Sequence, residues 1–400
     1  MDYKEYLGSS FNLETGEFNH QYAQEMVWKE KTTTNIVLLG ATGVGKSALV
    51  NAIFGDNIVD SQAGKPVTQF LQKIEIPNKG ITLWDTKGIE AQDYITTKSQ
   101  LIDDIKDGFQ KAFSTKNINE FPHIAWLCIK ESSARIEPRD QELLEISKSF
   151  KIPTVIVFTD KLAATDKFVE VAIKELSKNH GDFIKNRFVR VNTVPKKIDA
   201  HYTYPVCGLE ELITKTEECY DELDEILLGH REECKKAFLI AQTVNNKKRL
   251  SSMIDSAKNK VHYAAIAAGT VGLSPIPGSD APIIAAIQST MIYKINTDFE
   301  LALEENTSIS LITGILGVTA IAQVGKTVVN NLIKFIPVAG AVVGGVIGAA
   351  TATAITEAVG HAYIEVLTHY FNNETGKVEL PEATVEILDI FKRYFNYKKE

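Results

Sequence analysis

Eight residues near the start of the chain, GATGVGKS at positions 40–47, have the types and spacing that bind a phosphate. Glycines let the backbone curl so that successive N–H groups point at one anion. A helix that begins directly afterwards presents its free N–H groups to the same anion. We expect Lys46 to reach the β- and γ-phosphates of a nucleotide and the Ser47 hydroxyl to ligate Mg²⁺. The alternative is a glycine-rich turn with a structural role only.

A second motif, Asp85-Thr86-Lys87-Gly88, follows the apolar run Ile81–Trp84. A carboxylate at the end of a strand beside the phosphate loop can hold Mg²⁺ through water, and Gly88 can offer its backbone N–H to a γ-phosphate. The sequence therefore predicts Asp85 and Gly88 as parts of the same site.

A third motif, Lys65-Pro66-Val67-Thr68, lies in an expected loop before a strand at Phe70–Ile76. Thr68 is the candidate that closes over Mg²⁺ when a γ-phosphate is present, and the alternative is an ordinary loop threonine. The predicted catalytic residues are Lys46, Thr68 and Gly88, and the predicted metal ligands are Ser47, Thr68 and Asp85.

Short apolar runs alternate with longer helical stretches between residue 33 and about residue 230. This alternation predicts an α/β domain with a mostly parallel sheet that is covered by helices on both faces. The remaining expected strands are Ile36–Leu39, Ile124–Ile129, Thr154–Phe158 and Phe188–Val191.

Residues 33–230 resemble a translation-factor-class GTPase of the Era-like, dynamin-like and immunity-related group. The resemblance rests on GATGVGKS, KPVT and DTKG, and IPTVIVFT and GLEELI also follow the family's order. It implies a P-loop NTPase fold, GTP or GDP with Mg²⁺, and hydrolysis of GTP in a nucleotide-dependent switch. The expected nucleotide contacts are Gly40, Thr42, Gly43, Val44, Gly45, Lys46, Ser47, Ala48, Asp85, Thr159, Asp160 and Lys161.

The loop that would read the base departs from this family. The family has Asn or Thr followed by Lys-x-Asp, and the Asp accepts two hydrogen bonds from guanine. Here the order is Thr159-Asp160-Lys161-Leu162, so an aspartate takes the lysine position and a leucine the aspartate position. Asp160 or Asp166 could read the base in a rearranged loop, whereas a plain loop acid or a helix cap is the alternative for Asp160. The choice between guanine and adenine stays open.

A second departure concerns catalysis. Ile89 follows Gly88, where Ras-like enzymes carry a glutamine that orients water. Gly43 stands where some Era-like relatives bind potassium through an asparagine. We therefore expect slow intrinsic hydrolysis, with a partner or a second copy, in a homodimer through the GTPase domain, completing the site.

Composition bounds the remaining possibilities. The chain has 400 residues and a net charge of -8, which favours two or three domains and argues against a general nucleic-acid binder. Its four cysteines lack metal-ligand spacing, so free thiols in a cytoplasmic protein are expected. The polar start MDYKEYLGSS is not a secretory signal. The expected domains are a partly helical extension (1–32), the GTPase domain (33–230), a basic connecting helix (231–260) and a helical domain (261–400).

The C-terminal half contains two uncharged segments, 306–325 and 335–356, each about long enough to cross a bilayer. Small residues recur every four positions in the second, at Gly340, Gly344, Gly348, Ala352 and Thr356. The pair predicts a helical hairpin, either buried in a soluble all-α domain or in contact with a membrane surface. The basic stretch 235–260 suits an anionic lipid surface, and a solvated face is the alternative.

Upstream of these segments we expect two helices joined by a Pro-Gly turn around Ser274–Pro282. This half resembles an uncharacterised bacterial helical domain found with GTPases, through Pro275–Gly278 and Met291–Ile295. Two further functions follow as alternatives to a simple switch. One is a dynamin-like or immunity-related-like GTPase that self-assembles and acts on membranes, and the other is a nucleotide-gated scaffold with little turnover.

Overall fold

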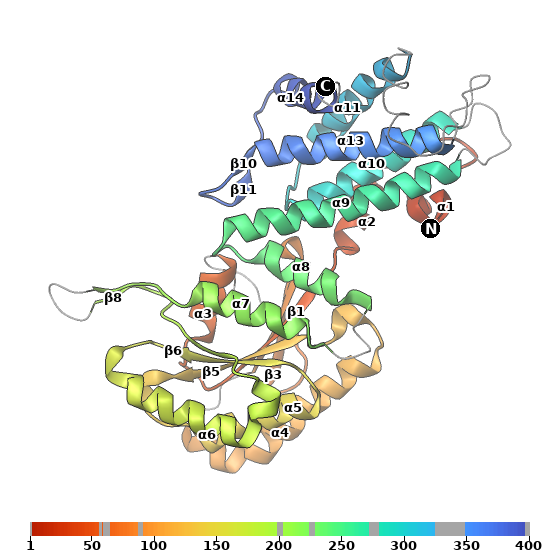
Figure 1. Cartoon of the computed structure of the whole chain (residues 1–400). Coiled ribbons are helices and arrows are strands. Elements are labelled where there is room, and N and C mark those ends of the chain that lie inside the picture. The colour runs from red at the N-terminus through yellow and green to blue at the C-terminus, as the bar shows by residue number, and fades with distance from the viewer. Residues whose placement is uncertain are drawn as a thin grey trace. The chain divides into compact units, whose positions relative to one another are not determined.

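The computed structural model describes residues 2–55, 58, 65–86, 91–197, 203–223, 229–271, 280–324 and 349–396. The chain divides into two compact units (Figure 1). One unit comprises residues 32–245, and the other combines residues 1–31 with residues 246–400.

The first unit is built on a sheet of seven strands in the order β2-β3-β4-β1-β5-β6-β7. The strands β4, β1, β5, β6 and β7 pair in parallel, whereas β2 and β3 are antiparallel additions at one edge. The mostly parallel sheet predicted from the apolar runs is therefore confirmed. Its strands are Thr34–Leu39 (β1), Lys65–Pro66 (β2), Leu71–Ile76 (β3), Ile81–Thr86 (β4), Ile124–Lys130 (β5), Thr154–Thr159 (β6) and Phe188–Arg190 (β7).

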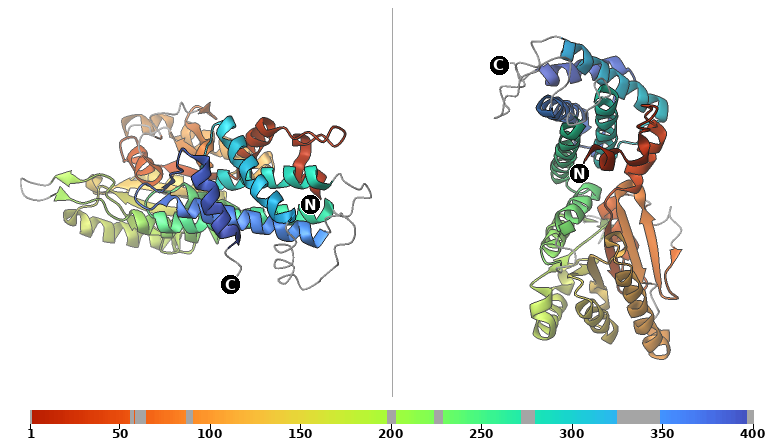
Figure 2. Two further views of the ribbon diagram at one scale, coloured as in Figure 1. Left: turned by 90° about the horizontal axis from the view of Figure 1, so that it is seen from above. Right: turned by 90° about the vertical axis from the view of Figure 1, so that its right-hand side faces the viewer.

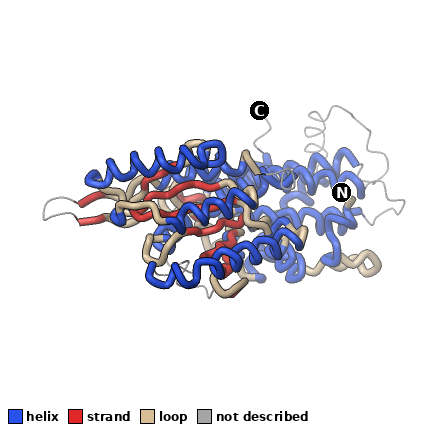
Figure 3. The backbone as a smooth tube through the Cα atoms, turned by 90° about the horizontal axis from the view of Figure 1, so that it is seen from below, coloured by secondary structure: helices blue, strands red, loops and turns tan. Residues whose placement is uncertain are grey.

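Helices cover both faces of this sheet, and the strands lie between the two helical layers in Figure 3. Alternate residues of β1 point to opposite faces, so Ile36 and Leu38 join one core while Val37 and Leu39 join the other. The first core holds α3 (Lys46–Phe54), α7 (Leu209–Tyr220) and α8 (Arg231–Ala241). The second holds α4 (Ala91–Ser114), α5 (Pro138–Ser149) and α6 (Asp166–Ile184). A small hairpin of β8 (Lys196–Lys197) and β9 (Thr203–Tyr204) follows β7.

The single basic helix predicted over 231–260 is two helices. The first, α8, ends at Ala241, and α9 (Asn246–Val271) begins after a turn in which Gln242 Oε1 accepts from the N–H groups of Val244 at 2.9 Å and Asn245 at 2.8 Å. Because α8 buries Phe238 in the sheet's core, it belongs to the first unit, which extends to residue 245. The prediction of one helix rested on the continuous run of basic residues. The structure separates α8 from α9 because α8 is buried against the sheet.

The second unit is helical and includes the N-terminal segment. Its helices are α1 (Tyr3–Leu7), α2 (His20–Lys29), α9, α10 (Asp280–Asp298), α11 (Glu305–Val324), α13 (Ala349–His369) and α14 (Thr384–Asn396), with a short hairpin of β10 (Phe371–Asn372) and β11 (Lys377–Val378). His20 Nδ1 lies 3.1 Å from Tyr293 Oη, and Gln24 donates to Leu303 O at 3.0 Å. The views in Figure 2 show the N-terminal helices beside this bundle. The extension is therefore part of the helical unit.

Small residues bring α9 and α13 close together. A methyl group on Gly360 would lie 2.4 Å from a Val261 methyl, and one on Gly269 would lie 2.6 Å from Thr353 Oγ1. Two helices, α9 and α10, flank the predicted Pro-Gly turn, most of which lies outside the described residues. Residues 325–348 of the predicted hairpin, with Gly340, Gly344 and Gly348, also lie outside them. Within the part of the chain that the structure describes, no helix combines the length and apolarity needed to span a membrane.

Candidate nucleotide-binding site

The loop at 40–47 joins β1 to α3 in a conformation that requires glycine. Gly40 has φ +130°, and a methyl group there would lie 2.4 Å from the carbonyl oxygen of Cys128 on β5. Gly43 and Gly45 also have positive φ, +77° and +95°, which L side chains rarely adopt. Because α3 begins at Lys46, the turn leads directly into a helix N-terminus. This is the backbone arrangement that the sequence predicts for a phosphate site.

The Lys46 side chain folds back onto the phosphate loop. Its ammonium donates to Gly40 O at 2.9 Å and to Ala41 O at 3.1 Å, and it lies 3.8 Å from Asp85 Oδ1. Asp85 reaches this point because β4 pairs with β1 in a register that places Asp85 opposite Leu38. The structure therefore brings together Lys46 and Asp85, which are 39 residues apart in the sequence.

The Asp85 carboxyl group has an oxygen that can bind a cation. Burial raises its pKa, while the Lys46 charge and a hydrogen bond from Gln72, 3.3 Å from Oδ2, lower it. Its buried Oδ1 accepts no hydrogen bond from the described residues. A buried carboxylate oxygen of this kind is costly unless a charge satisfies it. The Ser47 hydroxyl, exposed in the first turn of α3, is the second oxygen that could hold Mg²⁺.

Two of the predicted residues do not join this group. Thr68 lies in the turn between β2 and β3, where its methyl carbon would be 3.6 Å from a methyl group on Gly108 of α4. Its hydroxyl is buried and has no hydrogen-bond partner among the described residues. None of the described contacts joins Thr68 to Lys46 or Asp85, so its role stays a prediction. Gly88 and Ile89 lie outside the described residues.

The end of β6 lies against the phosphate loop. Thr159 donates its hydroxyl to Val44 O at 2.6 Å, and its Cβ would lie 3.8 Å from a methyl group on Gly45. Asp160 follows in the left-handed region, with φ +61°. The loop predicted to read the base is thus tied to the loop predicted to bind phosphate, and Thr159 makes the connection.

The carboxylate of Asp160 lies between two lysines. Its Oδ2 is 3.4 Å from Lys130 Nζ at the end of β5, and its Oδ1 is 3.6 Å from Lys196 Nζ on β8. The Lys161 N–H donates to Val191 O at 3.1 Å. Thr159, Asp160 and Lys161 therefore lie at the carboxyl ends of the parallel strands, where ligands commonly bind to sheets of this kind.

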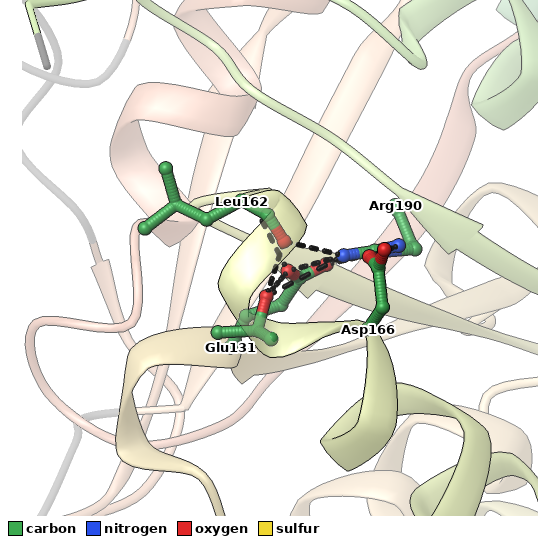
Figure 4. Close-up of polar contacts among 5 residues, drawn as sticks. Glu131, Leu162, Asp166 and Arg190 are labelled. Carbon is green, nitrogen blue, oxygen red and sulfur yellow. Dashed lines mark hydrogen bonds and ion pairs between the residues drawn. The ribbon is translucent and has the colours of Figure 1, made fainter.

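Beside this loop lies an ion pair between a buried glutamate and a partly buried arginine, which the sequence analysis did not identify. Arg190 on β7 donates to both carboxylate oxygens of Glu131, at 2.7 and 2.8 Å, and to Asp166 Oδ1 at 2.6 Å (Figure 4). Arg190 also donates to Leu162 O at 3.0 Å, and the Leu162 N–H donates to Glu131 at 3.2 Å. Asp166, a predicted candidate for reading the base, is therefore bonded to Arg190. The signal for Glu131 was its place directly after a parallel strand.

A cavity of about 390 Å³ adjoins the outer side of the phosphate loop. Its walls combine loop and strand residues with the start of α5, where Arg139 pairs with Glu137 at 2.6 Å. Asp140 accepts from the Glu137 N–H at 3.0 Å, and burial raises the Asp140 pKa to about 6. The cavity is lined by Ala41, Thr42, Gly43, Val44, Cys128, Ile129, Lys130, Ser133, Glu137, Arg139 and Asp140.

Comparison with known proteins assigns a family description to each unit. Residues 35–160 match the family model of a 50S ribosome-binding GTPase. Residues 242–393 match a domain of unknown function (DUF697). The small ribosomal subunit biogenesis GTPase RsgA of Methanosarcina acetivorans is 30% identical over 156 residues. That match covers 36% of this chain and 38% of the relative.

Two solved structures resemble this chain distantly. Translation elongation factor SelB from Methanococcus maripaludis, in complex with the GTP analogue GppNHp, has a TM-score of 0.31 at 11% identity, covering 48% of this chain and 35% of that one. The bacterial dynamin GTPase LeoA from ETEC has a TM-score of 0.28 at 11% identity, covering 99% and 92%. At these scores neither match carries an argument about function.

Proposed function

We propose that this chain, which carries a P-loop GTPase domain followed by a helical domain of unknown function, binds GTP with Mg²⁺ and hydrolyses it slowly to GDP. In this proposal the bound nucleotide acts as a switch whose state is transmitted to the helical domain. Four free cysteines suit a reducing cytoplasm as the place of action.

One observation carries the proposal. The Lys46 ammonium lies between two loop carbonyls and a buried Asp85 oxygen that accepts no hydrogen bond from the described residues. Three positive-φ glycines curl the adjoining backbone toward a helix N-terminus. A triphosphate with its cation satisfies each of these groups at once, because the phosphate takes the N–H groups and the ammonium while the cation takes the carboxylate.

The residues suggest how hydrolysis would proceed. Bound Mg²⁺ would neutralise charge that develops between the β- and γ-phosphates. Lys46 and the N–H groups of the loop would bind and orient the same oxygens. A glutamine that orients water does not follow Gly88 in the sequence, since Ile89 occupies that position. We therefore propose that turnover without a partner is slow.

Calorimetry with GTP, GDP and ATP, with and without Mg²⁺, tests the binding step. We expect Mg²⁺-dependent GTP binding, and a loss of affinity of roughly a hundredfold or more for Lys46→Ala, because a charge-assisted contact to phosphate disappears. Lys73→Ala is the matched control, since Lys73 on β3 is as buried as Lys46 but pairs with Glu120 instead of the loop. Equal affinities in Lys46→Ala and wild type would overturn the proposal.

The dependence of specific activity on protein concentration tests whether a second copy of the chain or an external partner completes the site. Turnover that rises with concentration supports a second copy, as in the self-assembling alternative. A constant low value leaves an external partner. Tight binding with negligible turnover under all conditions would favour the scaffold alternative, and co-sedimentation with anionic liposomes would test the membrane alternative.

A further inference from the structure

We propose that the Glu131–Arg190 pair positions the base-reading loop, so that Asp160, and not residue 162, offers the carboxylate that selects guanine. This inference rests on the proposed GTP binding, because it assigns the base specificity of the same site. It is argued from four sets of contacts around the loop 159–166.

The first set surrounds Glu131. This side chain is fully buried, yet its carboxylate meets donors from three residues, one on β7 and two in the loop 159–166. Arg190 donates at 2.7 and 2.8 Å, the Leu162 N–H donates at 3.2 Å, and the Thr165 hydroxyl also donates. A buried carboxylate needs such donors because an unpaired charge in the interior is strongly destabilising. Glu131 is therefore a fixed point on which the loop is built.

The second set surrounds Leu162. Its N–H donates to Glu131 and its C=O accepts from Arg190 at 3.0 Å, so both backbone groups of residue 162 are held by the pair. Figure 4 shows the Leu162 carbonyl turned toward Arg190 while the side chain leaves the cluster. The position at which the resembling GTPases carry their guanine-reading aspartate is thus occupied by a hydrocarbon side chain on an anchored backbone.

The third set removes Asp166 as a competitor. Its carboxylate lies 2.6 Å from Arg190 Nη1, and the Nε and Nη2 atoms of the same arginine hold Glu131. Moving Asp166 toward a base would break a charge-assisted hydrogen bond at the start of α6. Asp166 therefore supports Arg190 instead of reading the ligand.

The fourth set leaves Asp160 in a position to act. Asp160 lies between two anchored residues. Thr159, directly before it, is bonded to Val44 O, and Leu162, two positions after it, is bonded to Glu131. Between them Asp160 takes a left-handed backbone conformation, its side chain 32% exposed and close to Lys130 and Lys196. A partly exposed carboxylate, one residue after the threonine that bonds the phosphate loop, can accept from N1–H and the 2-amino group of guanine, and adenine offers no such pair of donors.

Selectivity, and not affinity alone, tests the inference. Binding of Mg²⁺ complexes of GTP, ITP and ATP is measured for wild type, Glu131→Gln and Arg190→Lys. We expect the preference for GTP over ITP and ATP to fall by roughly ten- to a hundredfold in both variants. This is the effect of losing one hydrogen bond to a charged group, because a displaced loop would misalign Asp160 with the base. Arg187→Lys is the control, because Arg187 also pairs with a glutamate, Glu222 at 2.6 Å, is more deeply buried than Arg190 and is not bonded to the loop. It should lower stability but leave the preference unchanged.

Asp160→Asn keeps the Glu131–Arg190 pair and tests the reader directly. An amide can donate to the 2-carbonyl of xanthine, so this variant should lose GTP affinity and gain XTP affinity, each by about tenfold or more. If the Glu131 and Arg190 variants fail to fold, as judged by thermal unfolding, the XTP result still decides the assignment of Asp160, and unchanged GTP preference in Asp160→Asn overturns the inference. So does an unchanged preference in folded Glu131→Gln. Wild-type protein that binds no nucleotide would instead refute the proposed function itself.

Discussion

The two ends of the candidate nucleotide site are built in different ways. At the phosphate end, one contiguous stretch supplies the glycines, the lysine and the helix start, and Asp85 joins them from β4. At the base end, the loop after β6 depends on Glu131 from the end of β5 and Arg190 from β7. The first arrangement is local and backbone-based, whereas the second is a side-chain network across three strands.

This difference teaches what each end tolerates. The phosphate end depends on positive φ values at Gly40, Gly43 and Gly45, and at Gly40 also on the absence of a side chain, so it is tied to glycines at fixed spacing. The loop after β6 is instead held by the Glu131–Arg190 ion pair, which bonds the backbone N–H and C=O of residue 162 and not its side chain. A departure from the family pattern at Leu162 is therefore compatible with a formed loop.

The largest effect is expected at the phosphate end from Gly40→Ala. The added methyl group would lie 2.4 Å from Cys128 O on a backbone with φ +130°, so we expect the free energy of unfolding to fall by about 3 kcal/mol or more. Gly43→Ala is the control, since nothing lies within 4 Å of its added methyl group, and it should cost only about 1 kcal/mol. Urea denaturation measures both, and equal losses would remove the steric argument.

The next prediction concerns pH at the cavity beside the phosphate loop. The Asp140 pKa is about 6, above its ordinary value of 3.8, because the side chain is buried. The folded state therefore binds the extra proton, and the stability that Asp140 contributes is full below pH 4 and lost as pH rises through 6. Asp140→Asn should be more stable than wild type at pH 8 by roughly 2 kcal/mol and nearly equal at pH 4.

The difference in stability between wild type and Asp140→Asn separates the effect of Asp140 from that of His123, which changes stability with pH in the opposite direction. His123 is buried with its pKa lowered to about 4, so its contribution is full above pH 6.5 and lost as pH falls. Both proteins share this histidine, and its effect cancels in the comparison. A difference in stability that is constant from pH 4 to 8, measured by urea denaturation, would contradict the prediction.

A smaller effect is expected where the two ends meet. Thr159→Val removes the hydroxyl that donates to Val44 O at 2.6 Å and leaves that carbonyl without this donor. We expect a loss of about 1–2 kcal/mol in stability and roughly tenfold in GTP affinity, since both loops lose their connection. Thr159→Ser keeps the hydroxyl and should retain affinity. If Thr159→Val binds GTP as wild type does, the two ends act independently.

The smallest effect is expected from restoring the family's aspartate with Leu162→Asp. The backbone of residue 162 is fixed by Glu131 and Arg190, so the new carboxylate should change GTP affinity by less than about threefold. Fluorescence titration of GTP and ITP provides the measurement. A tenfold rise in preference for GTP would show that residue 162 faces the base, and the contrast between the two ends would then disappear.

Part of this architecture followed from the sequence and part did not. The strands β1, β4, β5, β6 and β7 were predicted because buried parallel strands form unbroken apolar runs. The helix predicted over 231–260 failed because basic residues continue across the break at Gln242, while the burial that separates α8 from α9 is a tertiary property. The N-terminal extension, predicted as a separate region, packs in the helical unit through contacts such as His20 with Tyr293.

The sequence by itself determined the phosphate loop, since positive-φ glycines and a helix N-terminus act through consecutive backbone groups that any fold must place together. Tertiary structure alone decided that Asp85 lies beside Lys46, that Thr159 bonds Val44, and that Glu131 and Arg190 bond the backbone of Leu162. These contacts join residues far apart in the chain, and strand order and register set them. No local pattern of residue types carries that information.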